Sequence, residues 1–249
     1  MTYLELVNNV LSRLREETID AAQIDSNPYY RVIGTHVNDA KRQVEEAWQW
    51  GGLRDTDYIP LVPNATAQYE LPESSDRDYV IKRIASYPNT STVDFNNGSD
   101  RLWLRWRNVA QMRQYYQHPD AVPQGRATDF AVVGEAKTTR NKLIQVFPRP
   151  EGVVPNVAHW LEIEHYKNQS LLTAADDVLK VPSLPVYTLA TALASRERGE
   201  VGGTSTAEWF QMADKYLSDA IAYDSALYGN ELDWGGNIDY PNRTNFRFA

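Results

Sequence analysis

The chain has 249 residues, enough for one large domain or two small ones, and its 42% hydrophobic residues, seven Trp and fifteen Tyr exclude a disordered protein. It contains no cysteine, which excludes disulfides, thiol catalysis and cysteine-ligated zinc and fits a cytosolic origin. The 33 acidic and 25 basic side chains give a net charge of −8, which argues against a protein that grips nucleic acid but permits one past which DNA slides. No apolar run approaches the ~18 residues of a membrane helix, so we expect no membrane partner.

Two amphipathic helices are predicted at the N-terminus. Thr2 and Glu5 form a capping-box pattern, and apolar residues then follow at spacings of three and four up to Leu14. Pro28 suits the first turn of a second helix, whose apolar positions repeat in the same way up to Trp48 and Trp50. The spacing predicts a packed helical hairpin and assigns charged residues of the second helix to its solvent side, namely Lys41, Arg42 and Glu45.

Short strands are predicted in the middle of the chain. Residues 58–71, with prolines at 60 and 63 and a third just after at 72, predict a hairpin with a proline-marked edge. Further strands are expected at residues 79–84, 91–95, 101–106, 130–133, 143–147 and 160–166. The strands at 130–133 and 143–147 are expected to pair, and the prolines at 148 and 150 stiffen the turn that follows. With a short helix at 108–116, the pattern predicts a compact antiparallel sheet or a small barrel.

Helical spacing returns after Pro182 and again after Thr206, where apolar residues alternate by four and three up to Leu227. The final twenty residues lack a period but are rich in large apolar side chains: Trp234, Ile238, Tyr240, Phe246 and Phe248. Burying each of them would gain about 1.5–3 kcal/mol. We therefore expect this segment either to fold back onto its own subunit or to dock on a partner.

The sequence predicts no catalytic, cofactor-binding or metal site. His159 and His165 lie on one face of a predicted strand, but zinc needs ligands converging from two elements. The acidic pairs at 16–17, 45–46 and 176–177 are interpreted as solvated surface rather than as a glycosidase couple. The glycines at 202–203 lack the spacing of a phosphate-binding loop, and no nucleophile elbow occurs.

Arg101, Arg105 and Arg107 alternate with Leu and Trp residues, the only basic–aromatic cluster of the sequence. Such a cluster can contact single-stranded nucleic acid by stacking. Strand residues with one charged face explain it better, and an inter-subunit surface is a third interpretation.

Taken in order, these elements resemble the head-to-tail adaptor (connector) proteins of tailed bacteriophages, including tail tubular protein A. The segments that carry the resemblance are residues 2–11, 48–50, 58–61, 143–150, 164–167, 171–177 and 181–185. The resemblance implies an α+β fold, in which an antiparallel helical bundle carries an inserted antiparallel sheet or barrel and an extended C-terminal arm. The corresponding domains are residues 1–54 with 172–229 for the bundle, 55–171 for the β domain and 230–249 for the arm.

The resemblance also implies a structural virion protein without enzymatic activity or cofactor, assembled in the host cytoplasm into the neck or tail. Such adaptors form rings, typically of twelve copies, that join the portal to the tail or nozzle protein and line a channel for DNA without sequence-specific binding. The aromatic residues of the arm would bind the portal. The alternatives are another neck or tail structural protein (a hub or stopper), a virion-associated peptidoglycan hydrolase, and a DNA-binding module that uses the arginine cluster.

Overall fold

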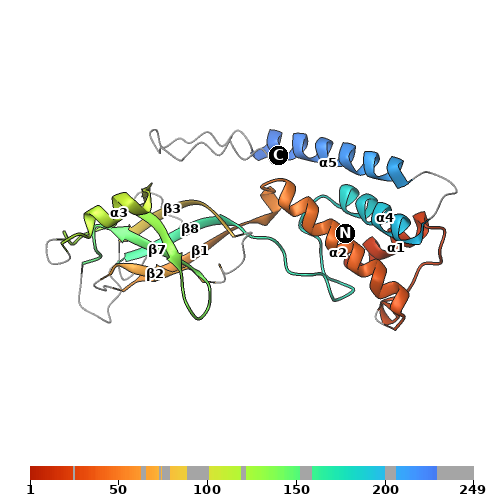
Figure 1. Ribbon diagram of the computed structural model, residues 1–249, viewed down its shortest axis with the longest axis horizontal. Coiled ribbons are helices and arrows are strands. Elements are labelled where there is room, and N and C mark those ends of the chain that lie inside the picture. The colour runs from red at the N-terminus through yellow and green to blue at the C-terminus, as the bar shows by residue number, and fades with distance from the viewer. Residues whose placement is uncertain are drawn as a thin grey trace. The chain divides into compact units, whose positions relative to one another are not determined.

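The computed structural model describes residues 1–24, 26–62, 66–72, 74, 79–88, 101–118, 122–151, 159–199 and 206–228. Within these ranges the chain forms five α-helices and two four-stranded sheets, and it divides into two compact units (Figure 1). The helical unit comprises Met1–Arg54 and the described part of Asn168–Leu232. The β unit comprises the described part of Asp55–Lys167.

The two N-terminal helices form as predicted: α1 spans Tyr3–Arg13 and α2 spans Pro28–Ala47. The capping box is present, because the Thr2 amide donates to Glu5 Oε2 at 2.8 Å and the Glu5 amide donates to Thr2 Oγ1 at 3.3 Å. These bonds satisfy two amides that the start of a helix leaves without partners. Pro28 occupies the first turn of α2, where its missing N–H costs nothing.

The two C-terminal helices complete this unit: α4 spans Ser183–Arg198 and α5 spans Thr206–Tyr228. Helix α4 ends at Gly199, whose φ of 63° is a conformation that glycine adopts without strain. Apolar side chains of α1, α2 and α4 form one buried core, which includes Leu6, Val7, Val10, Leu11, Ile33, Val37, Ala40, Val44, Val186 and Ala190. Figure 1 shows α5 lying along α4.

Helix α5 is only partly covered. Ala213 is buried and Leu217 packs against the core, whereas Tyr223 and Leu227 are 70% and 58% exposed. The helix itself is confirmed, but the burial that its apolar spacing implies stops after Ala220 and Ile221, the last of its residues that pack against the core. The described structure therefore leaves the C-terminal part of this apolar face, at Tyr223 and Leu227, open to solvent.

The β unit contains two sheets. One has the order β1 (Arg54–Leu61), β8 (His159–Tyr166), β3 (Val80–Pro88) and β4 (Leu102–Trp103). The other has the order β2 (Gln68–Glu70), β7 (Lys142–Phe147), β6 (Asp129–Glu135) and β5 (Arg105–Trp106), and α3 (Val109–Tyr115) packs on β6 and β7. Both sheets contribute to one core, which includes Ile59, Leu61, Tyr69, Ile84, Phe130, Ile144, Val146, Leu161 and Ile163.

The strand positions are largely as predicted, and the antiparallel pairing of β6 with β7 is confirmed. The predicted hairpin at 58–71 is wrong, because β1 and β2 belong to different sheets. The barrel alternative is wrong as well, since the described strands form two separate sheets, and the β5–β6 pair is parallel rather than antiparallel. Pro60 does lie in an edge strand, as a residue without an N–H requires.

The predicted strand at 101–106 is divided at Leu104. The Leu104 amide donates to the Ile84 carbonyl at 2.8 Å, and the Arg105 amide donates to the Thr128 carbonyl at the same distance. Two consecutive residues thus pair with different sheets, while the Leu104 side chain is completely buried. The strand predicted at 91–95 and the turn after it lie outside the described residues.

Candidate assembly surface of the helical unit

An apolar groove of about 640 Å³ runs along the C-terminal half of α5, with the segment after α2 and the start of α4 as its other wall. It is lined by Trp50, Gly52, Lys180, Pro182, Leu184, Pro185, Tyr216, Asp219, Ala220, Tyr223, Asp224 and Leu227. Among these, Leu184, Tyr223 and Leu227 are large apolar side chains that remain exposed. An apolar hollow with a few charged groups at its rim is the usual form of a binding site on a protein surface.

Two tryptophans hold in place the wall of the groove that the segment after α2 forms. The Trp50 indole is 1% exposed, and its Nε1–H donates to the Val44 carbonyl at 2.7 Å. Trp48 lies nearer the surface, and its Nε1–H donates to Asp224 Oδ2 at 2.9 Å. The same carboxylate accepts from the Gly51 amide at 3.4 Å. These bonds fix α5 against the segment after α2 at the open end of its apolar face, between Tyr223 and Leu227.

Gly52 allows the residues before α4, which form another wall of the groove, to come close to the segment after α2. A Cβ atom at this position would lie 2.4 Å from the Lys180 carbonyl oxygen, which is nearer than real Cβ atoms come to backbone. A glycine here therefore lets residues 180–182 pack directly on the segment after α2. The prolines at 182 and 185 then open α4, with Pro182 at the N-cap.

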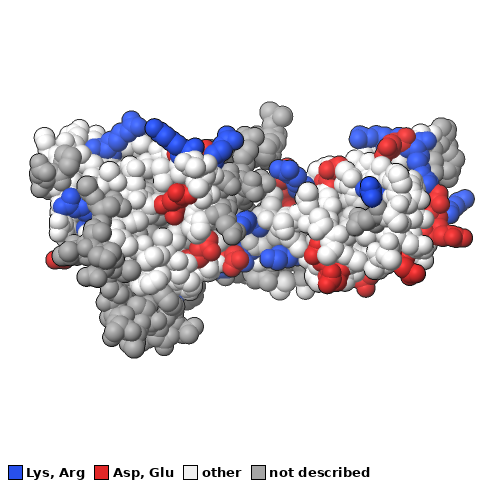
Figure 2. Space-filling view, turned by 90° about the horizontal axis from the view of Figure 1, so that it is seen from below, with Lys and Arg blue, Asp and Glu red and all other residues white. Residues whose placement is uncertain are grey.

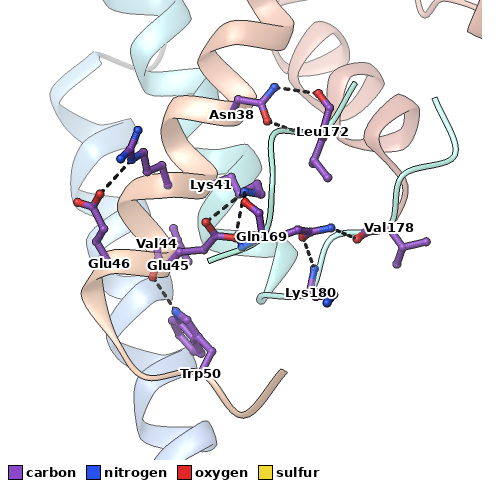
Figure 3. Close-up of polar contacts among 11 residues, drawn as sticks. Asn38, Lys41, Val44, Glu45, Glu46, Trp50, Gln169, Leu172, Val178 and Lys180 are labelled. Atoms are coloured by element: carbon purple, nitrogen blue, oxygen red, sulfur yellow. Dashed lines mark hydrogen bonds and ion pairs between the residues drawn. The ribbon is translucent and has the colours of Figure 1, made fainter. Parts of the chain in front are cut away.

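A polar network around the buried pair Lys41 and Glu45 holds the loop that leads to α4 (Figure 3). Lys41 Nζ lies 3.0 Å from Glu45 Oε1 and donates to the Gln169 carbonyl at 2.6 Å. The Gln169 side chain in turn donates to the Val178 carbonyl at 2.7 Å and accepts from the Lys180 amide at 3.1 Å. Residues 169–180 are thereby attached to α2, and Lys180 is held at the edge of the groove.

The sequence assigned Lys41 and Glu45 to the solvent side of α2, and this assignment is wrong. Their side chains are 2% and 1% exposed, because the loop after β8 covers them. The neighbouring pair Arg42 and Glu46 has the same spacing yet is 66% and 52% exposed, as predicted. A signal was present: Lys41 follows Val37 by four residues, so it lies at the border of the apolar stripe.

Two arginines of the cluster in the β unit, Arg101 and Arg107, pair with carboxylates of neighbouring strands. Arg101 donates to Glu162 at 2.7 Å and to the Tyr87 hydroxyl at 2.6 Å, and its guanidinium lies 4.9 Å from the centre of the Trp103 ring. Arg107 Nε lies 2.6 Å from Asp129 Oδ1. Arg105 is exposed.

The Tyr87 hydroxyl in turn donates to Glu162. Burial and this hydrogen bond raise the pKa of Tyr87 to about 12, so the hydroxyl stays a donor at neutral pH. The carboxylates of Glu162 and Asp129 thus pair with Arg101 and Arg107, and these ion pairs reduce the positive charge that the cluster could offer to the phosphates of a nucleic acid.

The remaining predicted residues form no site within the described structure. His159 is half-buried, and burial lowers its pKa. His165 is buried and stacks on Tyr79, with ring centres 4.3 Å apart. Among the described residues no group of acidic or histidine side chains could hold a metal ion. The five aromatic and apolar residues predicted to bind the portal, Trp234, Ile238, Tyr240, Phe246 and Phe248, lie outside the described residues.

Charges on the helical unit are mixed. On the face that Figure 2 shows, acidic side chains are distributed over this unit, with Lys and Arg side chains among them. A surface of mixed charge, together with an apolar groove, suits contacts between proteins better than a grip on nucleic acid.

None of the described helices has the length and hydropathy that crossing a bilayer requires.

Comparison with known families gives the class of protein. The family model described as SU10 adaptor protein matches residues 1–234. The chain belongs to the SU10 adaptor family. No curated protein sequence matches the chain.

Membership identifies the adaptor as a phage structural protein of the adaptor type, whose class of partner is the other proteins of the phage head and tail. The resemblance to phage adaptors is thus confirmed at the level of the family. A structural family also fits the prediction that the chain is not an enzyme.

Proposed function

We propose that this protein is the head-to-tail adaptor of a tailed phage, similar to tail tubular protein A. It forms a ring, of twelve copies as in related adaptors, that joins the portal to the tail or nozzle protein at the neck of the virion. The observation that carries the proposal is the match of residues 1–234 to the adaptor family. The open groove and the exposed apolar side chains of α5 support it, because such surfaces are stable when a neighbour covers them.

The proposal includes the organisation of the chain. Residues 1–54 and 172–229 form the bundle, residues 55–171 form the β domain inserted into it, and residues 230–249 form the arm. The shared core of α1, α2 and α4 supports the bundle, and the compactness of the two units supports the insertion. The bundles pack side by side around the channel, and the β domain faces the next tail component.

The charge of the chain suits a channel wall. Each copy contributes a net charge of −8, so a ring concentrates negative charge around the passing genome. Repulsion between this wall and the phosphates lets DNA slide without being held. The ion pairs that engage Arg101 and Arg107 support the same conclusion, since they reduce the positive charge available to bind DNA.

The arm attaches the ring to the portal through Trp234, Ile238, Tyr240, Phe246 and Phe248. These side chains are spaced over fifteen residues without regular period, which fits an extended segment docking into a groove better than a helix.

Negative-stain images of the purified adaptor, alone and mixed with its portal, test the ring. Rings in either sample are the expected result, and monomers that stay separate with the portal present would contradict the proposal. Truncation after Tyr228 should abolish portal attachment while the helical unit keeps its fold.

A finer test compares two full-length double variants. Phe246→Ser/Phe248→Ser should lose portal binding, whereas Asn242→Ser/Asn245→Ser should retain it. Equal binding by both variants would exclude the aromatic arm as the attachment point. Zymography on peptidoglycan should show no clearing, and clearing would favour the hydrolase instead.

A further inference from the structure

The groove on the helical unit lacks a partner within the described chain, yet the sequence that could fill it begins at its edge. Leu227 lines the groove, and the arm starts three residues later, at residue 230. We propose that, in the free adaptor, the groove binds the end of the same chain's arm, with Phe246 and Phe248 in the apolar hollow and Arg247 at its acidic rim.

The dimensions permit this contact. Asp219 lies nine residues before Tyr228 on α5, which corresponds to about 14 Å along the helix. The eighteen residues from Tyr228 to Phe246 can span about 60 Å when extended. The arm is therefore long enough to turn back and reach any part of the groove.

Shape and polarity also agree. The groove offers Tyr223 and Leu227, which are 70% and 58% exposed, and a volume of about 640 Å³ that can accept large side chains. Two phenylalanines separated by a single residue can both enter such a hollow in an irregular or turned segment.

The charges are complementary. Of the three Asp, Glu, Lys or Arg side chains that line the groove, two are acidic, Asp219 and Asp224, and one is basic, Lys180. The last ten residues of the sequence contain Arg243 and Arg247 and no acidic residue. Asp224 already accepts bonds from the segment after α2, so Asp219, which is exposed, is the partner available to Arg247.

This contact has a consequence for assembly. The residues that it covers are among those we assign to the portal, so the portal must displace the arm from the groove before the ring is fixed. That consequence rests on the proposed function. The contact itself does not, and its absence would leave the proposed ring unaffected.

Engineered disulfides test the contact in the full-length protein. The chain has no cysteine, so a pair introduced as Leu227→Cys and Asn245→Cys forms the only possible disulfide within a chain. Leu227 is 58% exposed, so the substitution leaves the core intact, and Asn245 precedes the phenylalanines without replacing them. The control pair is Val32→Cys with Asn245→Cys. Val32 is also exposed, at 39%, but lies about 22 Å before the end of α2.

A disulfide requires Cα atoms within about 7 Å, so a docked arm should join the Leu227 pair much faster than the control pair. We expect at least a tenfold difference (roughly 1.4 kcal/mol) in the rate at which a faster-migrating monomer appears on a non-reducing gel. Equal rates for the two pairs would overturn the proposal. A ladder of covalent oligomers would place a neighbouring copy's arm in the groove and would overturn the same-chain assignment.

Charge reversal identifies the polar contact. In the Leu227/Asn245 cysteine background, Arg247→Asp should slow the cross-link, and Asp219→Arg added to it should restore the rate. Failure of the second substitution to restore the rate would exclude the Arg247–Asp219 pair. Residues 227 and 245 are only eighteen residues apart, so an undocked arm also brings them together more often than the control pair. Phe246→Ser/Phe248→Ser in the same background keeps this separation and should still slow the cross-link, and an unchanged rate would contradict docking by the phenylalanines.

Discussion

Replacing Lys41 by methionine should destabilise the helical unit strongly, because the substitution leaves a charge buried without its partner. Glu45 has a side chain that is 1% exposed, and Lys41 Nζ lies 3.0 Å from its carboxylate. The Gln169 carbonyl loses its 2.6 Å donor in the same step. Breaking a buried ion pair from one side costs about 3–5 kcal/mol. With a urea m-value of about 2 kcal/mol/M, the midpoint should fall by about 2 M.

The assay is urea unfolding followed by tryptophan fluorescence. Trp50 is buried beside the network and reports on the helical unit, while far-UV circular dichroism checks that one transition is observed. Arg42→Met is the matched control, since its pair with Glu46 has the same spacing on the same helix but is exposed. It should change stability by less than about 0.5 kcal/mol.

The double variant Lys41→Met/Glu45→Gln separates the charge from the packing. Glutamine removes the buried charge and keeps an acceptor for the backbone amide of Gln169, which donates to Glu45 Oε1 at 3.3 Å, so at least half of the lost stability should return. A cost below about 1 kcal/mol for Lys41→Met alone, or no recovery in the double variant, would refute the view that an uncompensated charge causes the loss.

Three other substitutions probe local features. Gly52→Ala should destabilise the helical unit by roughly 1–3 kcal/mol, because its Cβ would meet the Lys180 carbonyl, and a urea midpoint equal to that of wild type would contradict the close approach. Thr2→Ala should lower the free energy of unfolding by about 1 kcal/mol, because it removes the cap that Glu5 completes. The same urea experiment measures it, and an unchanged free energy would contradict a stable cap in solution. Two backbone N–H groups lower the pKa of Asp177. A carboxyl with a depressed folded-state pKa stabilises above its ordinary value of 3.8 and loses that contribution as pH falls through the folded value. The Tm advantage of wild type over Asp177→Asn should therefore be full at pH 6 and shrink below pH about 3.8, and a constant advantage across this range would exclude the effect.

Local signals predicted the helices and most strands because their causes are local. The capping box at Thr2 and the proline at 28 act within one helical turn, and apolar spacing reports the face of each helix. Strand pairing has no such local cause. Strands 54–61 and 68–70 alternate apolar residues in the same way whether they pair with each other or face a common core from two sheets, so the sequence could not separate the alternatives.

The candidate site was harder to predict for the same reason. Each wall of the groove comes from a different part of the sequence, and the apolar spacing of α5 gives no sign that its cover ends before Tyr223. The buried pair of α2 has the same four-residue spacing as the exposed pair beside it, and only the loop carrying Gln169 distinguishes them. The arginine cluster was visible in sequence, but its carboxylate partners lie 22 and 61 residues away.

The division of a strand at Leu104 has a mechanical consequence for the β unit. Adjacent peptide groups are hydrogen-bonded to different sheets, so a pull on this segment is carried by both sheets at once. A module built in this way shares a load between its two sheets, a useful property in a structural protein of a phage particle.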